Sequence, residues 1–171
     1  SLYSGASGSA GGIGHMVIDV NGPRCSCGNT GCLEALVSGT AVAKEAIRRI
    51  RQGERSSLTE IVGGKIEDIT AEEVLTAARA GDSLASEVIL KAATYLGVGL
   101  ANVVNIFNPE MIIIGGGMAK MGDLLLNPAR QVVEERAYQL SAQAVQIVPA
   151  QLGDDAGVLG AAVFAFQQEV D

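Results

Sequence analysis

The sequence predicts an α/β fold with parallel strands. Its last third runs strand, glycine-rich turn, helix twice over: 111–114, 115–117 and 124–138, then 145–148, 153–157 and 156–168. Of the 171 residues, 48% are apolar and 18% are charged, which is enough apolar surface to bury a core. This composition excludes a disordered tail.

The chain before this α/β part is predicted to be irregular at first and then helical. Residues 1–14 are rich in Gly, Ser and Ala, which is typical of either a flexible linker or a functional loop. Residues 16–20 form a short β-type run that the turn at 21–23 ends. Residues 33–52 carry apolar side chains at helical spacing, and Gly53 ends that helix.

Two further helices are predicted after a mixed polar loop with a short helix at 54–69. Thr70 and Glu73 form a capping box that opens the first helix, which ends near Gly81. Asp82 can cap the second, long helix, which runs to about residue 107.

Two segments in the second half are predicted to pack closely. Gly97, Gly99 and Ala101 form a patch of small residues on the long helix, so another element should approach it closely. Met111–Ile114 is apolar without alternation, which is typical of a buried central strand.

Two glycine-rich turns are candidate phosphate or nucleotide contacts. Gly115, Gly116 and Gly117 lie between a strand and a helix, where exposed amides can approach a phosphate. The alternative is tight strand-to-helix packing, because the sequence is neither a Walker A motif nor a clean dinucleotide fingerprint. In Gly153–Gly157 the alternatives are helix capping by Asp and a nucleotide contact.

Charge and the N-terminal sequence limit the expected partners. The net charge of −7, with three Tyr, three Phe and no Trp, argues against a nucleic-acid surface. No uninterrupted apolar stretch approaches the ~18–20 residues of a membrane span. The start at Ser1 has neither an initiator Met nor the pattern of a signal peptide. We therefore expect a cytoplasmic protein of which this chain is one part.

The single histidine and all three cysteines lie close together in the sequence. His15, Cys25, Cys27 and Cys32 span eighteen residues, and glycines between the last two cysteines permit a tight loop. Three thiolates and an imidazole make a closed tetrahedral zinc site, so the metal would be structural. The alternative is three reduced cysteines in a glycine-rich turn.

These residues together resemble the ROK family, which groups bacterial sugar kinases with sugar-responsive repressors. Gly14–His15 and Cys25–Glu34 match, residue for residue, the family pattern G-H followed by C-x-C-G-x-x-G-C-x-E. Further similarity extends over nearly the whole chain, at 105–110, 112–117 and 153–157, and resembles the glucokinase branch at 21–24 and 35–40.

The resemblance implies the C-terminal part of an actin-like, ribonuclease-H-like ATPase fold, with an inserted zinc-binding loop and helices. It implies that His15 and the three cysteines bind structural zinc, and that the other ring nitrogen of His15 contacts a sugar hydroxyl. Glu34 would accept a hydrogen bond from a sugar hydroxyl, and Gly115, Gly116 and Gly117 would lie against ATP. The implied reaction transfers the γ-phosphoryl group of MgATP to the 6-hydroxyl of glucose.

Two departures from the family pattern limit this implication. The family's aspartate base and its phosphate loop lie upstream of Ser1, so no catalytic residue is predicted here and the chain is not expected to be active alone. The family has a sugar-binding Glu two residues before Gly14, where this chain has Gly12. A lost charged hydrogen bond is worth about 1.5–3 kcal/mol, which is roughly ten- to a hundredfold in sugar affinity.

Three functional hypotheses stay open. The first is a fragment of an ATP-dependent hexose kinase with glucose as its sugar. The second is the sugar-sensing domain of a ROK repressor, whose DNA-binding helices would precede this part. The third is a non-catalytic, zinc-stabilised oligomerisation domain, and a homodimer is expected because dimers are common in the family. Each treats 1–171 as a partial C-terminal domain without its N-terminal domain, divided into a zinc and sugar-site module at 15–34, a helical region at 35–108 and a nucleotide-side region at 109–171.

Overall fold

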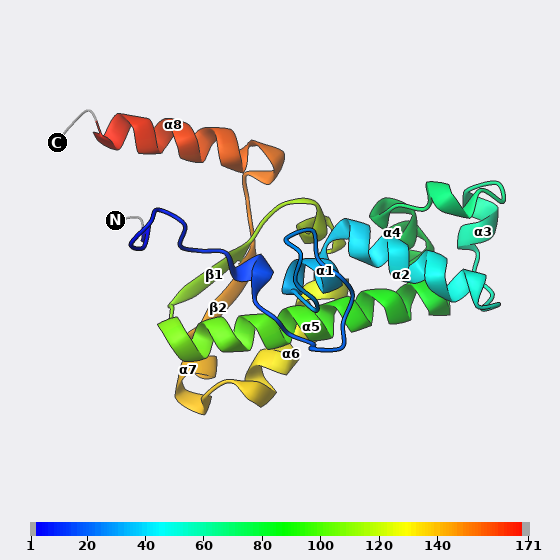
Figure 1. Ribbon diagram of the computed structural model, residues 1–171, viewed down its shortest axis with the longest axis horizontal. Coiled ribbons are helices and arrows are strands. Elements are labelled where there is room, and N and C mark those ends of the chain that lie inside the picture. The colour runs from blue at the N-terminus through cyan, green and yellow to red at the C-terminus, as the bar shows by residue number, and fades with distance from the viewer. Residues whose placement is uncertain (1–2, 169–171) are drawn as a thin grey trace.

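A long central helix organises the computed structural model, which describes residues 3–168 (Figure 1). The predicted unit 1–171 therefore includes five terminal residues that lie outside the described residues. The elements in chain order are η1 (Ile13–His15), α1 (Leu33–Val37), α2 (Gly39–Arg51), α3 (Leu58–Ile61), η2 (Ile66–Asp68), α4 (Ala71–Arg79), α5 (Ser83–Phe107), β1 (Met111–Ile114), η3 (Gly117–Met121), α6 (Asp123–Arg136), α7 (Gln139–Ala144), β2 (Gln146–Pro149), η4 (Gly153–Asp155) and α8 (Ala156–Gln168).

Helix α5 runs along the body, with α2–α4 at one end and the strands and α7 at the other (Figure 1). As predicted, Asp82 caps it by accepting a hydrogen bond from the Ala85 amide at 2.8 Å. Asn108, in the left-handed conformation, ends it before Pro109. Among the helices described, α5 alone is long and apolar enough to cross a membrane. Here its buried side chains form the core with those of α1, α2, α4 and α6.

The small-residue patch on α5 makes the close contacts that the sequence predicts. A Cβ atom at Gly97 would lie 2.5 Å from the Cβ atom of Val132 on α6. A Cβ atom at Gly99 would lie 2.8 Å from a methyl group of Leu33 on α1. Neither contact leaves room for a side chain, so these glycines fix how closely α1 and α6 approach α5.

Strands β1 and β2 pair in parallel, from Met111 with Gln146 to Ile114 with Pro149, which confirms the predicted strand direction. The prediction that β1 is buried on both faces is wrong for the described residues. Ile112 packs with Ile114 against the α5–α6 cluster, whereas Met111 and Ile113 are 49% and 62% exposed. The unbroken apolar run therefore has one packed face and one open face.

Three predicted elements differ in their boundaries or type. The helix predicted at 33–52 is divided at Ser38, whose hydroxyl accepts a hydrogen bond from the Ala41 amide and so caps α2. The predicted strand 16–20 is reduced to an isolated bridge between Val17 and Cys32, because the tight loop bends the chain away. The helix predicted at 124–138 ends at Arg136, and α7 is a separate short helix.

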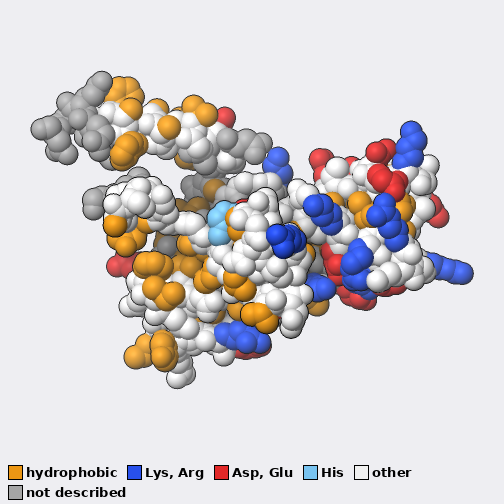
Figure 2. All heavy atoms as spheres, in the orientation of Figure 1, with side chains coloured by type: hydrophobic (Ala, Val, Ile, Leu, Met, Phe, Trp, Pro, Cys, Tyr) orange, Lys and Arg blue, Asp and Glu red, His pale blue; other side chains and the backbone are white. Residues whose placement is uncertain are grey.

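The last helix, α8, confirms the prediction for 156–168 but leaves the body after β2 (Figure 1). Its apolar side chains are exposed, including Phe166 at 69%. Hydrophobic side chains gather on α8 and over the strand end of the body, whereas charged ones gather over the α2–α4 end (Figure 2). On this face, the charged side chains are thus densest at one end and the apolar ones at the other.

Candidate functional site

The four predicted metal ligands come together in one cluster. The donor atoms of His15, Cys25, Cys27 and Cys32 all lie within 4.8 Å of one another. The His15 Nδ1 atom is 3.8 Å from the Cys25 Sγ atom, and the Sγ atoms of Cys27 and Cys32 are 3.7 Å apart. Tetrahedral zinc with Zn–S bonds near 2.3 Å would hold its sulfur ligands about 3.8 Å apart. The chemistry and spacing of these donors therefore fit a structural zinc ion.

Gly31 closes the loop that carries the three cysteines. Its carbonyl oxygen accepts hydrogen bonds from the amides of Ile18 at 2.8 Å and Asp19 at 3.3 Å, and its own amide donates to the Pro23 carbonyl. A Cβ atom at this position would lie 1.5 Å from the Asp19 carbonyl oxygen, and the backbone has a φ of 72°. Only glycine satisfies both constraints without moving the loop.

The local environment separates the acidities of the two buried thiols, Cys25 and Cys32. A backbone hydrogen bond at Cys27, aided by His15 and the other two thiols, lowers the pKa of Cys25 to about 6 against the opposing effect of burial. Burial, together with the neighbouring thiols, raises the pKa of Cys32 to about 12. A cation bound among them would hold all three as thiolates, because metal binding displaces thiol protons.

Glu34 and His15 lie next to each other at the edge of this cluster. A Cβ atom at Gly14 would be 3.6 Å from the Oε2 atom of Glu34, so the carboxylate lies beside the residue that precedes His15. Both side chains are exposed. Cys32 is the N-cap of α1, and Glu34 lies in the first turn of that helix. Both predicted sugar-binding residues are thus exposed, and the Glu34 carboxylate lies beside the backbone that leads into His15.

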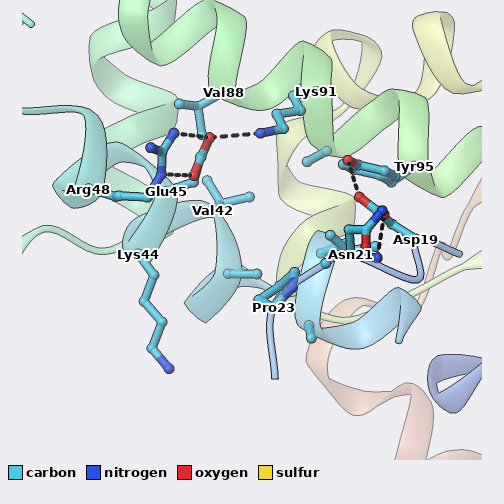
Figure 3. Close-up of a pocket in the computed structure, with 15 residues that line it drawn as sticks. Asp19, Asn21, Pro23, Val42, Lys44, Glu45, Arg48, Val88, Lys91 and Tyr95 are labelled. Atoms are coloured by element: carbon cyan, nitrogen blue, oxygen red, sulfur yellow. Dashed lines mark hydrogen bonds and ion pairs between the residues drawn. The ribbon is translucent and has the colours of Figure 1, made fainter. Parts of the chain in front are cut away.

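A cavity of about 460 Å³ lies behind the cysteine loop, between it and helices α2 and α5 (Figure 3). On one side of it, the Tyr95 hydroxyl of α5 donates a hydrogen bond to the Asp19 carboxylate at 3.1 Å. Asp19 is also the residue whose carbonyl oxygen excludes a side chain at Gly31. Tyr95 therefore anchors the closure point of the loop to the core helix.

An ion-pair network joins α2 to α5 across the same cavity (Figure 3). The Glu45 carboxylate accepts hydrogen bonds from Arg48 at 2.7 Å and from Lys91 at 2.9 Å. The Arg48 guanidinium, with help from Lys91, lowers the pKa of Glu45 to about 2. These contacts stabilise the packing of α2 on α5.

The predicted glycine turn after β1 lines a second cavity, of about 930 Å³. Gly115 and Gly117 lie in its wall and are exposed, and Gly116 between them has a φ of 75°. The N-termini of α2 and α4, at 38–40 and 70–72, also line it. Backbone amides at helix N-termini favour negative charge, but Ser38 and Thr70 already cap one amide in each helix, and the Glu72 carboxylate lines the same cavity.

Sequence reasoning found the glycine turn but missed the rest of this cavity. Arg79 and Lys120 also line it, as do the two helix N-termini. The capping box at Thr70 did mark the start of α4, but no local signal shows that α2, α4 and the turn meet. The second candidate turn, Gly153–Gly157, forms η4 and the start of α8, and none of its described residues Gly153, Asp155 and Gly157 lines this cavity.

Comparison with known sequences gives one family and two kinds of relative. The model of the ROK family matches residues 1–168. A glucokinase of Halalkalibacterium halodurans is 41% identical over 170 residues, which are 99% of this chain and 51% of the relative. A xylose repressor of Caldicellulosiruptor bescii is 37% identical over 159 residues, which are 93% of this chain and 39% of the relative. The chain thus spans about half the length of the glucokinase and less of the repressor.

Comparison with solved structures gives the same result for the fold. A ROK family glucokinase from Streptomyces griseus, solved in complex with glucose and AMPPNP, superposes with a TM-score of 0.85. The two chains are 32% identical, and the match covers 98% of this chain and 55% of the other. A ROK hexokinase from Thermus thermophilus matches all of this chain and 52% of its own, with a TM-score of 0.77 at 31% identity.

Proposed function

Because the chain belongs to the ROK family, we propose that it supplies the zinc-holding, sugar-facing part of an ATP-dependent sugar kinase. The observation that carries the proposal is the cluster of His15 with three cysteines, together with the exposed carboxylate of Glu34 beside Gly14, the residue that precedes His15. The similarity to glucokinases supports glucose as the substrate and its 6-hydroxyl as the acceptor. We also propose that the chain forms the C-terminal part of an actin-like ATPase fold.

In this proposal the residues beside the cysteines bind the sugar. A zinc ion, when bound, stabilises the loop and takes no part in phosphoryl transfer. The Nδ1 atom of His15 faces Cys25, which leaves the Nε2 atom to bond a sugar hydroxyl. Glu34 accepts a hydrogen bond from a second hydroxyl, and its negative charge strengthens that bond.

The cavity at the glycine turn is the proposed nucleotide side. Amides of Gly115, Gly116 and Gly117 and of the two helix N-termini would face the phosphates of MgATP, and Arg79 adds positive charge near the same wall. We assign no residue of this chain as the base for the sugar hydroxyl. Phosphoryl transfer would therefore need residues from the part of the relatives that this chain does not match. The 171 residues alone would not catalyse it.

The test uses the full reading frame that contains this chain. A coupled assay with glucose and MgATP should show phosphoryl transfer, and Glu34→Gln should raise the KM for glucose by roughly ten- to a hundredfold, because one charged hydrogen bond is weakened. Glu60→Gln is the matched control, since Glu60 is an exposed carboxylate on α3. Equal KM values for the two variants, or zinc-loaded protein without transfer to any hexose, would overturn the proposal.

A second candidate is the sugar-sensing domain of a ROK repressor, which the 37% identity with a xylose repressor over 93% of this chain favours. In that case the full reading frame would bind sugar without transferring phosphate, and would release a DNA site when sugar is added. The net charge of −7 fits a part that does not itself contact nucleic acid.

The remaining assignments concern location and assembly. We propose a cytoplasmic protein that forms a homodimer. A third candidate, a zinc-stabilised oligomerisation domain, has the same assembly but no ligand. Sedimentation of the full reading frame, with calorimetry against glucose, separates it from the others: a dimer without sugar binding would support this third function.

A further inference from the structure

We propose that Cys27 and Cys32 form an oxidisable pair, a modification site at which a peroxide converts the metal-bound loop into a disulfide form. This inference rests on the metal site proposed above and adds a regulatory modification to it. It assigns different roles to the three cysteines: Cys27 reacts first, Cys32 resolves, and Cys25 stays reduced.

The geometry of the pair supports this division. The Sγ atoms of Cys27 and Cys32 are 3.7 Å apart, so a disulfide of about 2.0 Å requires them to approach by about 1.7 Å. The four residues between them include Gly28, whose added Cβ atom would meet no described atom within 4 Å. That open space lets the segment adjust at Gly28, since Gly31 at its other end is held by backbone hydrogen bonds.

Exposure decides which sulfur an oxidant reaches first. Cys27 is exposed, whereas Cys32 is fully buried and Cys25 is 5% exposed. The Cys25 sulfur faces the imidazole of His15 and the hydroxyl of Ser26. A small oxidant from solvent therefore meets the Cys27 sulfur first, with the Cys32 sulfur 3.7 Å from it.

The chemistry balances with a peroxide as the oxidant. The Cys27 thiolate attacks one peroxide oxygen, the O–O bond breaks, and a sulfenic acid forms as hydroxide leaves. The Cys32 thiolate then attacks the Cys27 sulfur, the S–S bond forms, and the S–O bond breaks as a second hydroxide leaves. Two protons from solvent convert both hydroxides to water. The two sulfurs lose two electrons and the peroxide gains them.

Oxidation would act on both the metal and the sugar-facing turn. The disulfide removes two of the four donors, so only His15 and Cys25 remain for the metal. Cys32 is the N-cap of α1 and pairs with Val17. A displaced Cys32 therefore shifts the first turn of α1, which carries Glu34, and sugar affinity should fall together with metal affinity.

The test begins with zinc-loaded chain treated with hydrogen peroxide. A chromophoric chelator should report one zinc released per disulfide formed, and a dithiol should reverse the change. After alkylation, trypsin yields peptide 25–44, which contains all three cysteines and no internal Lys or Arg. We expect the alkyl group on Cys25 only. Alkylation of Cys27 or Cys32 in the oxidised protein would overturn the proposed pair.

Two matched variants separate the pair from the metal site. Cys25→His and Cys27→His each leave two thiols and two imidazoles, a donor set that structural zinc sites use. Cys25→His keeps the reactive pair and should lose zinc to peroxide at the wild-type rate, whereas Cys27→His should lose it at least tenfold more slowly. Equal rates would contradict the inference. Wild-type protein that holds no zinc before oxidation would instead contradict the metal site itself.

Discussion

Replacement of Gly31 by alanine gives the sharpest test of how the cysteine loop is built. Gly28 provides a matched control in the same loop, because both glycines have positive φ values, 72° for Gly31 and 90° for Gly28. They differ in their surroundings. A Cβ atom at Gly31 would lie 1.5 Å from the Asp19 carbonyl oxygen, whereas one at Gly28 would meet no described atom within 4 Å.

The expected losses follow from that difference. Gly28→Ala incurs only the left-handed conformation of a residue with a side chain, about 1–2 kcal/mol. Gly31→Ala incurs the same and also forces the loop open, which breaks the hydrogen bonds that Gly31 makes with Ile18, Asp19 and Pro23. At roughly 1 kcal/mol for each bond, the free energy of unfolding should fall by about 4–5 kcal/mol.

The same opening should weaken metal binding, because Gly31 directly precedes the ligand Cys32. The three broken bonds, about 3 kcal/mol in all, correspond to roughly a hundredfold loss in zinc affinity beyond the loss in Gly28→Ala. Gly28→Ala, at about 1–2 kcal/mol, should lose roughly five- to thirtyfold. Competition with a chromophoric chelator measures the affinities, and thermal unfolding with and without excess zinc measures stability.

An equal loss of zinc affinity in Gly31→Ala and Gly28→Ala would contradict the steric role of Gly31. Wild-type zinc affinity in Gly31→Ala would contradict it as well, because a side chain at this position must move the loop that carries Cys32. A variant Gly31→Ala that unfolds early but regains its melting temperature with excess zinc is expected, since ligand binding stabilises the folded state.

Three other outcomes are expected. Gly97→Ala should lower the melting temperature, because its Cβ atom would meet Val132 at 2.5 Å. The cost of overpacking, about 1–3 kcal/mol, outweighs the gain in helix propensity. The control Gly160→Ala, on the exposed face of α8, should not lower the melting temperature. Glu45 has a pKa of about 2 in the folded chain against an ordinary 4.5, so its contribution to stability is present above pH 4.5 and is lost as pH falls toward 2; urea unfolding of Glu45→Gln should therefore depend less on pH over that range than unfolding of the wild type. Gly12→Glu in the full reading frame should tighten glucose binding by roughly ten- to a hundredfold in calorimetry, and unchanged binding would contradict the assignment of that position to the sugar site.

Much of the helical region could be predicted because its signals are local. Thr70 and Asp82 accept hydrogen bonds from the backbone within their own helix starts, as their positions in the sequence predict. The division at Ser38 was missed, although a Ser before Gly39 is also a local capping signal. Apolar residues continue at helical spacing across Ser38, so the pattern predicts one helix where the structure has two.

Burial of β1 could not be predicted from the strand itself. The run Met111–Ile114 is equally apolar on both faces, so it predicts two packed neighbours. Only the face with Ile112 has a neighbour among the described residues. Periodicity indicates what a strand can bury, and the rest of the fold decides what covers it.

The candidate site likewise has one part that the sequence predicts and one part that it does not. The four metal donors lie within eighteen residues, so a tight loop brings them together and sequence spacing predicts the cluster. The cavity at Gly115 is built from segments that are far apart in the chain. Capping signals predicted that α4 begins near Thr70, but only the packing of α2 and α4 with the turn shows that they share a cavity.

Gly97 and Gly99 on α5 set the distance between the two parts of the chain that we assign to the two substrates. Gly99 seats α1, which carries Glu34, and Gly97 seats α6, which follows the glycine turn and η3. The bare backbone of α5 thus sets how far apart α1 and α6 lie, and with them the segments that we propose face sugar and phosphate. Transfer between bound groups demands reacting atoms about 3–3.5 Å apart. In the proposed kinase, a methyl group at Gly97 or Gly99 should therefore slow phosphoryl transfer as well as lower the melting temperature.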